Sequence, residues 1–304
     1  MMKIIFVTPG KANLPEIKAY SKYFSLHGDE VFVVNREDIE KYKYAHFDLE
    51  WHFMGFSRKK LTNSRLVIHE YASLSTPPFS KFKNTIKGIF SHTPDLRVFL
   101  NHKVKDDLTF LCESKYLIRD MGVELPKQGF MINTDSKYDF LYVGAMDPSR
   151  DIDGLIKLFI DPSYNPNRLK LFLLGKAQDD LLERYKAHSN IVFLGFVPQE
   201  EVFSYILDSE VCVNWIPNVY PYNIQTSTKL LEYAAMGKKV ITTRYNWVDE
   251  FSERSSYPLF FFSDEHGLSR SFFSKDRNVP SVASWSKIFQ ELKLRDYILN
   301  LLKE

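Results

Sequence analysis

Residues 138–243 carry the feature that most limits what this chain can fold into, a regular alternation of short apolar runs and amphipathic segments. The apolar runs are rich in β-branched and aromatic residues, as strands are, and they cover 138–144, 169–175, 190–196, 210–216 and 238–243. The segments between them have the periodicity of helices, and the connections are short. Strands that alternate with helices pair in parallel and are covered on both faces. This half of the sequence therefore predicts a doubly wound parallel α/β sheet.

The first half of the chain has a similar but less regular pattern. Residues 3–8 indicate a strand, a helical pattern follows and ends at Gly28, and residues 30–35 indicate a second strand. Further apolar runs cover 65–70, 97–101 and 115–120. The 304 residues thus predict two Rossmann-like domains, 1–138 and 139–304, facing each other across a cleft. The helical pattern of residues 284–304 indicates a terminal helix, which we expect to pack back toward the first domain.

The charge and the cysteines of the chain narrow its partners and its compartment. The net charge is +2, and the excess of basic residues in 1–138 is too weak to indicate a nucleic-acid partner. No apolar run reaches the length of a transmembrane helix, and the N-terminal run lacks the cleavage site of a signal peptide. Cys112 and Cys212 each stand alone in an apolar context, where we expect reduced core thiols. These features predict a cytoplasmic protein.

Residues 77–90 form a basic amphipathic segment. Aromatic and aliphatic residues recur in it at roughly helical spacing with lysines between them, namely Phe79, Phe82, Ile86, Ile89 and Phe90 with Lys81, Lys83 and Lys87. We interpret this pattern first as a core helix with a solvated lysine face. The second interpretation is a surface for peripheral contact with the inner face of a membrane, through the basic first domain.

Ligands of parallel α/β sheets bind where the strands end, so the residues that follow strands are the candidate site. Gly10 follows the first strand and would let a ligand approach the backbone. His69 and His102 end two later runs and are candidate polar contacts or bases, although a structural histidine at the core edge is the commoner case. Asp151 and Asp153 have the spacing of a D-x-D metal motif, but acids in the first turn of a helix are favoured by its dipole. We therefore predict no metal site.

In the second half, two loops and one helix carry the residues that suit an anionic ligand. Gly144 ends the first strand, and Arg150 follows just before a helix, where backbone N–H groups favour phosphate. Gly195 ends a later strand and exposes its backbone. The stretch TSTKLLEYAAMG, residues 226–237, places Lys229 three residues before Glu232 on one helix. These two residues form either a solvated helix face or part of a binding site.

The second half resembles the C-terminal domain of the retaining GT-B glycosyltransferases of the family 4 type, also called group 1. The resemblance rests on GAMDPSRDIDGLI, LFLLG, NIVFLGFVPQEEVFSYILDSEVCVNW and KLLEYAAMGKKVITT, which follow in the family's order and spacing. It covers residues 139–245 well and the first domain loosely. It implies a nucleotide-diphosphate sugar, with UDP or GDP not distinguished, as donor on the second domain.

The resemblance also implies roles for individual residues. Glu232 is the second acid of the family's E-x7-E pair and binds ribose hydroxyls, while Arg150 and Lys229 hold the diphosphate, so these three are the catalytic candidates. The backbone near Val197 meets the base. Apart from the resemblance, the loops that follow strands and the entry to the helix offer further candidate donor contacts, namely Gly10, Gly144, Gly195, Thr226, Ser227 and Thr228. His69 and His102 are candidates on the acceptor side. No metal and no cofactor other than the donor are implied.

The resemblance implies a metal-independent retaining glycosyltransferase that serves a glycan or lipid-linked acceptor in surface polysaccharide or glycoconjugate synthesis. Two residues depart from the family's pattern, because Ile224 stands where the first acid of the pair belongs and Ala145 replaces an arginine. These departures motivate an alternative, a non-catalytic glycosyltransferase-like binding subunit. A sugar-nucleotide epimerase of the same architecture is a further alternative.

Overall fold

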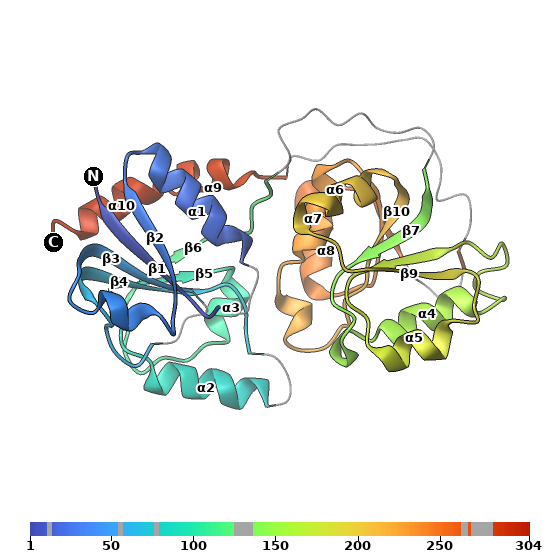
Figure 1. Ribbon diagram of the computed structural model, residues 1–304, viewed down its shortest axis with the longest axis horizontal. Coiled ribbons are helices and arrows are strands. Elements are labelled where there is room, and N and C mark those ends of the chain that lie inside the picture. Colours follow the sequence, from blue (N-terminus) through green and yellow to red (C-terminus); the bar gives the residue numbers. More distant parts are fainter. Residues whose placement is uncertain (11–13, 54–56, 76–78, 125–135, 263–266, 269–281) are drawn as a thin grey trace. The chain divides into compact units, whose positions relative to one another are not determined.

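The computed structural model describes residues 1–304 except 11–13, 54–56, 76–78, 125–135, 263–266 and 269–281 (Figure 1). The chain forms two compact units, the first made of Met1–Glu124 and Ala283–Glu304 and the second of Leu125–Val282. Each unit has a parallel six-stranded sheet with flanking helices. The prediction of two Rossmann-like α/β domains is confirmed, and the C-terminal segment belongs to the first unit.

The first unit has the strand order β2-β1-β3-β4-β5-β6. Its strands are β1 (Lys3–Thr8), β2 (Glu30–Asn35), β3 (His46–Phe53), β4 (Asn63–Tyr71), β5 (Leu96–Phe99) and β6 (Lys115–Ile118). Its helices are α1 (Pro15–Leu26), the 3-10 helix η1 (Ile39–Tyr42), α2 (Ser80–Phe90), α3 (His102–Asp106), α9 (Trp285–Glu291) and α10 (Leu294–Leu301). The chain switches direction across the sheet between β1 and β3.

The C-terminal helices complete the core of the first unit. Phe289 of α9 stacks on Tyr20 of α1 at 4.6 Å between ring centroids, and Figure 1 shows α9 and α10 beside α1. Gly122 makes this approach sterically feasible, since a Cβ there would lie 2.7 Å from the backbone nitrogen of Trp285. The tail is not one helix as the sequence predicts, because Lys293 takes a left-handed conformation with φ 44° between α9 and α10.

The second unit has the strand order β12-β11-β10-β7-β8-β9. Its strands are β7 (Tyr138–Val143), β8 (Leu171–Leu174), β9 (Ile191–Gly195), β10 (Ser209–Asn214), β11 (Lys239–Thr242) and β12 (Leu259–Phe261). Its helices are η2 (Pro148–Arg150), α4 (Ile152–Ile160), α5 (Asp179–Tyr185), α6 (Gln199–Leu207), η3 (Tyr222–Ile224), α7 (Thr228–Ala235) and α8 (Asn246–Ser255). The core lies between the sheet and these helices, with Phe140, Leu171 and Val211 fully buried.

Two expectations for single segments are wrong. Residues 80–90 do form a helix, α2, but its aromatic side chains lie at the surface rather than in the core. Cys212 is a buried free thiol as predicted, whereas Cys112 is exposed. Among the described residues, none of the helices combines the length and the apolar character needed to cross a bilayer.

Candidate functional site

The second sheet has its topological switch point between β7 and β10. These strands pair in parallel, so the loops that follow Val143 and Asn214 leave the same edge of the sheet side by side. From β7 the chain winds to β8 and β9 on one side, and from β10 to β11 and β12 on the other. Such a point leaves an opening between the diverging loops, where α/β sheets bind ligands. The loops 144–151 and 215–227 lie there and contain four of the predicted donor residues, Gly144, Arg150, Thr226 and Ser227.

Helix α7 starts at this point and carries Lys229 and Glu232. Ser227 caps its N-terminus by accepting a hydrogen bond from the backbone N–H of Leu230, and its hydroxyl donates to Asn214 Oδ1 at 2.7 Å. Lys229 Nζ lies 2.7 Å from Glu232 Oε2, and 26% and 16% of the two side chains remain exposed. The other carboxylate oxygen, Glu232 Oε1, takes no part in this ion pair, and the Glu232 side chain is partly exposed to solvent.

The hydroxyl of Tyr233 joins α7 to the end of β7. It accepts a hydrogen bond from the backbone N–H of Val143 at 3.2 Å, in a buried position. The second turn of α7 is thus held next to the end of β7, which leads into the loop that contains Gly144. A Cβ on Gly144 would lie 2.9 Å from the hydroxyl of Tyr142, so the loop packs closely against the end of this side chain.

Arg150 connects the two loops. Its guanidinium lies 4.6 Å from the ring centroid of Tyr222, and Ser149 Oγ lies 2.8 Å from the Tyr222 hydroxyl. The positive charge also acts on Tyr245, whose pKa is raised to about 12 by burial while hydrogen bonds to Asn214 and Ser227 and the charge of Arg150 oppose this rise. Arg150 is half-buried and enters no ion pair among the described residues. It is therefore an available cation at the switch point.

Three further predicted residues line the entry to α7. Thr226 has a buried Oγ1 that finds no hydrogen-bond partner within the described part of the chain. Ser227 is occupied as the cap, and Thr228 is the first residue of the helix. Because the buried Oγ1 of Thr226 has no partner among the described residues, it is well placed to bond to a ligand.

Gly195 and Val197 lie on the same edge of the sheet but farther from α7. Gly195 ends β9, which is separated from β7 by β8, and it has φ 78° with open space where a Cβ would be. The loops are nevertheless packed together, because Gly175 N donates to Gly195 O at 2.9 Å and Gly144 N donates to Leu174 O at 3.0 Å. Gly10, also with positive φ, belongs to the first unit.

The D-x-D pair has structural roles. Asp151 caps α4 by accepting from the backbone N–H of Gly154 at 3.2 Å. Asp153 lies 2.6 Å from Lys157 Nζ and 2.6 Å from Arg184 Nη1, and hydrogen bonds hold the pKa of its carboxyl at about 2. No cluster of metal-ligating side chains occurs in the parts of the chain that the structure describes.

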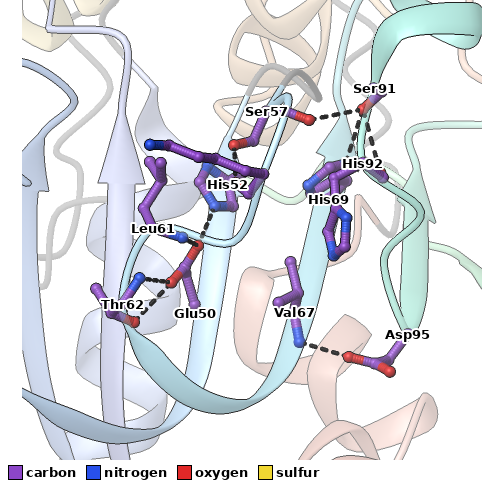
Figure 2. A network of polar contacts seen from close by, with 11 residues as sticks. Glu50, His52, Ser57, Leu61, Thr62, Val67, His69, Ser91, His92 and Asp95 are labelled. Carbon is purple, nitrogen blue, oxygen red and sulfur yellow. Dashed lines mark hydrogen bonds and ion pairs between the residues drawn. The ribbon is translucent and has the colours of Figure 1, made fainter. Parts of the chain in front are cut away.

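In the first unit, His69 is fully buried and lies within β4 rather than at its end (Figure 2). Its Nδ1 is 3.3 Å from Ser91 Oγ, and its Nε2 finds no hydrogen-bond partner in the described residues. The neighbouring His52 bonds to Glu50 at 2.7 Å, and the two imidazole rings are 5.2 Å apart. The ring of His69 is thus packed inside the protein, which fits the structural interpretation better than that of an acceptor base.

His102 differs from His69 in exposure and in its position in the fold. It is exposed, and it opens the short helix α3, where Asn101 supplies the cap by accepting from the backbone N–H of Val104 at 2.8 Å. The sequence predicts a strand end here, whereas β5 stops at Phe99. No described contact relates His102 to His69.

The burial of His69 predicts a loss of stability in acid. Burial, with the charges of His52, His92, Arg97 and Arg36, lowers its pKa from 6.5 to about 2. The unfolded chain therefore takes up a proton below about pH 6.5 that the folded chain excludes, and the free energy of unfolding falls by about 1.4 kcal/mol per pH unit. Urea unfolding of the wild type and of His69→Gln, at about pH 7.5 and 5.5, measures this. The variant should lose less stability on acidification, while His102→Gln should behave as wild type.

A buried ion pair in the first unit was not predicted at all. Arg119 and Glu70 form a hydrogen-bonded pair with fully buried side chains, and Trp51 Nε1 donates to the other carboxylate oxygen at 3.0 Å. Arg119 also lies 5.0 Å from the ring of Trp285, so the pair supports the returning C-terminal segment. Burial raises the pKa of Glu70, and the charge of Arg119 opposes this. A single acid in the run RLVIHE gives no sign of its partner in the sequence.

Comparisons with known proteins bear on the second unit and on the fold. Residues 137–261 match the family described as glycosyl transferases group 1. No curated protein sequence matches the chain. The fold is similar to that of AviGT4, a glycosyltransferase involved in avilamycin A biosynthesis, with a TM-score of 0.64, 11% identity and coverage of 100% of this chain and 97% of that one.

Two other solved structures are similar. One is sucrose-phosphate synthase from Thermosynechococcus elongatus, with a TM-score of 0.58, 12% identity and coverage of 100% and 92% of the two chains. The other is WaaG, a glycosyltransferase involved in lipopolysaccharide biosynthesis, with a TM-score of 0.58, 10% identity and coverage of 99% and 93%. The TM-scores show that this chain shares the GT-B fold with these proteins, and at identities this low the likeness shows the fold alone. Together with the family match, they support a transferase enzyme.

Proposed function

We propose that the protein is a metal-independent retaining glycosyltransferase of the family 4 type. It moves a sugar from a nucleotide-diphosphate sugar to a glycan or lipid-linked acceptor, in surface polysaccharide or glycoconjugate synthesis. The observation that carries the proposal is the convergence of Arg150, the Thr226 hydroxyl and the Lys229–Glu232 pair at the switch point of the second sheet. The match of residues 137–261 to glycosyl transferases group 1 supports it.

The chemistry follows from the charges of these side chains. When the bond between the sugar and the diphosphate breaks, negative charge grows on the leaving group, and fixed cations stabilise it. We assign this role to Arg150 and Lys229. Glu232 accepts hydrogen bonds from the vicinal ribose hydroxyls, for which a carboxylate is well suited. The backbone after Gly195, near Val197, meets the base.

The first test of this proposal is nucleotide binding. The folded protein is titrated by calorimetry with UDP-, GDP- and dTDP-sugars, and we expect one nucleotide class to bind and its sugar to be released to an acceptor. A folded protein that binds none of these nucleotides would falsify the proposal. The same panel settles whether the donor carries UDP or GDP.

Replacing Glu232 by glutamine should weaken nucleotide binding by about 10- to 100-fold, because a hydrogen bond to a charged group is worth roughly 1.5–3 kcal/mol. The matched control is Glu201→Gln, an exposed acid in the first turn of α6, which should bind as wild type. Calorimetry with the preferred nucleotide measures both. Equal affinity of the two variants would rule out Glu232 as the ribose ligand.

A non-catalytic binding subunit is the second candidate function. The observation that favours it is Ile224, a half-buried apolar residue at the position of the family's first acid, together with exposed Ala145. This function predicts nucleotide binding without sugar release from any donor in the panel. Release of the nucleoside diphosphate in the presence of an acceptor extract would contradict the non-catalytic function and support the glycosyltransferase.

We also propose that the protein works in the cytoplasm and that its basic first unit makes peripheral contact with the inner face of a membrane. Support comes from the uneven distribution of charge and from helix α2. A lipid-linked acceptor would reach the enzyme there.

A further inference from the structure

Helix α2 buries the face opposite to the one that its sequence pattern predicts to be buried. The residues it buries are small or polar, namely Ser80, Asn84 and Gly88, which recur every four residues along one face. Gly88 is essential to this packing, because a Cβ there would lie 1.8 Å from the carbonyl oxygen of Thr109. The small residues let the helix pack closely against residues 109–110 of the same unit. Helix α2 lies at the outer margin of the first unit (Figure 1).

The opposite face of α2 presents large apolar side chains to solvent. Phe79 is 78% exposed, Phe82 66% and Phe90 56%, and Ile89 is also exposed. Isolated exposed apolar residues are ordinary, but four on one short helix form a patch, and such a patch marks an interaction surface. We call these four residues together with the lysines of the helix the α2 surface.

The α2 surface is basic throughout. Lys81, Lys83 and Lys87 alternate with the aromatic residues, and the sequence from residue 71 to 94 contains no aspartate or glutamate. On the buried side of the helix, Asn84 Nδ2 donates a hydrogen bond to Asp107 Oδ2 at 3.4 Å. Burial and the charge of Lys83 lower the pKa of Lys87, so its ammonium would gain from an anionic neighbour.

A second basic segment lies next to the C-terminal end of α2. The backbone carbonyl oxygen of Ser57 accepts a hydrogen bond from the backbone N–H of His92 at 2.6 Å, and Figure 2 shows Ser57 facing Ser91. The exposed residues that follow Ser57 in sequence are Arg58, Lys59 and Lys60. The contact brings this basic triplet to the end of the helix that carries exposed Phe90.

We propose that the α2 surface docks on an anionic lipid bilayer, with its aromatic side chains in the interface and its lysines and the segment 58–60 on the lipid headgroups. Amphipathic helices with aromatic residues and lysines on one surface bind membranes in this way. An acidic protein partner would match the lysines, but it would leave a row of phenylalanines facing charge. The inference rests on the proposed membrane contact and gives it a surface and a lipid class.

The test is sedimentation of the full-length protein with two kinds of vesicle, one of phosphatidylcholine alone and one with about a third phosphatidylglycerol. We expect binding to the anionic vesicles only, and weaker binding at high salt because screening reduces the attraction. The double variant Phe82→Ser/Phe90→Ser should bind about tenfold more weakly. The variant Lys83→Gln/Lys87→Gln should lose about fivefold for each lysine.

Matched controls and a second readout keep the test decisive. Leu26→Ser removes a side chain that is 78% exposed at the end of α1, and Lys43→Gln removes an exposed lysine near η1, so both should bind as wild type. Absence of binding to anionic vesicles contradicts both the membrane contact and its surface. Binding that survives the α2 changes contradicts the surface alone, and so does a change of oligomeric state in Phe82→Ser/Phe90→Ser without lipid, which would mean that a second copy covers it. Nucleotide titration of the same variants tests donor binding separately.

Discussion

Replacing Arg150 by alanine should reduce kcat/KM for sugar transfer by about 100- to 1,000-fold, the loss of roughly 2.7–4 kcal/mol that follows removal of one fixed donor to a developing negative charge. Arg150 is half-buried, and its guanidinium is aligned by the ring of Tyr222. A lysine at this position restores the charge but not the planar guanidinium with its bidentate contact, so Arg150→Lys should recover activity only in part.

The control for this prediction is Arg184→Ala. Arg184 is an exposed arginine in the last turn of α5, where it pairs with Asp153, and it should be dispensable for transfer. Thermal unfolding of both variants separates a loss of transfer from a loss of folding. If Arg150→Ala folds and transfers sugar as fast as Arg184→Ala, the leaving diphosphate is not bound at this loop.

The second large effect is on stability. Arg119→Leu should lower the free energy of unfolding by about 3–5 kcal/mol, because Glu70 would lose its counter-charge in a fully buried position. The double variant Glu70→Leu/Arg119→Leu should recover much of this loss, since an apolar pair of similar volume carries no desolvation cost. Chemical denaturation followed by tryptophan fluorescence measures the free energy of unfolding of each variant, because Trp51 and Trp285 both contact the pair.

Arg65→Leu is the matched control in the same unit. Its guanidinium lies 3.5 Å from Asp48 with half of its side chain exposed, so the loss should stay within about 1 kcal/mol. An Arg119→Leu variant as stable as Arg65→Leu would show that the buried pair contributes nothing. A double variant no more stable than Arg119→Leu would show that its two members are not coupled.

The alternation of strands and helices in the second unit was predictable because its central parallel strands are largely buried on both faces and are therefore continuous apolar runs. The runs at 138–144 and 169–175 contain β7 and β8, and the entry to α7 follows from Ser227 as cap and Gly237, with φ 65°, as stop. Where the signals are local, the sequence is sufficient. The division of the chain is not local, since it depends on contacts between Gly122 and Trp285.

The side of α2 that is buried could not be predicted for a similar reason. Periodicity identifies which residues share a face, but not which face packs against the protein. The rule that apolar faces are buried failed because Gly88 and Ser80 permit an approach that larger residues would block. The pairing of Glu70 with Arg119 has no sequence signal either, because its members lie 49 residues apart.

At the candidate site, the sequence identified residue types and the fold supplied their neighbours. The spacing of Lys229 and Glu232 is that of an i,i+3 helical pair, so their contact was predictable from local geometry. The position of Arg150 over Tyr222 was not, since it depends on two loops that meet only when β7 and β10 pair. The apolar run predicts that the strand ends near His69, which makes this residue a candidate base, whereas β4 continues to Tyr71 and His69 is fully buried within it.

We propose that a nucleoside diphosphate binds at the switch point of the second sheet. A crystal structure of the protein soaked with UDP or GDP, whichever binds more tightly in the titration, tests it most directly. We predict the ribose hydroxyls within hydrogen-bond distance of Glu232 and the diphosphate on Arg150 and Lys229, next to Thr226. Nucleotide density elsewhere, with these side chains free, would contradict the account.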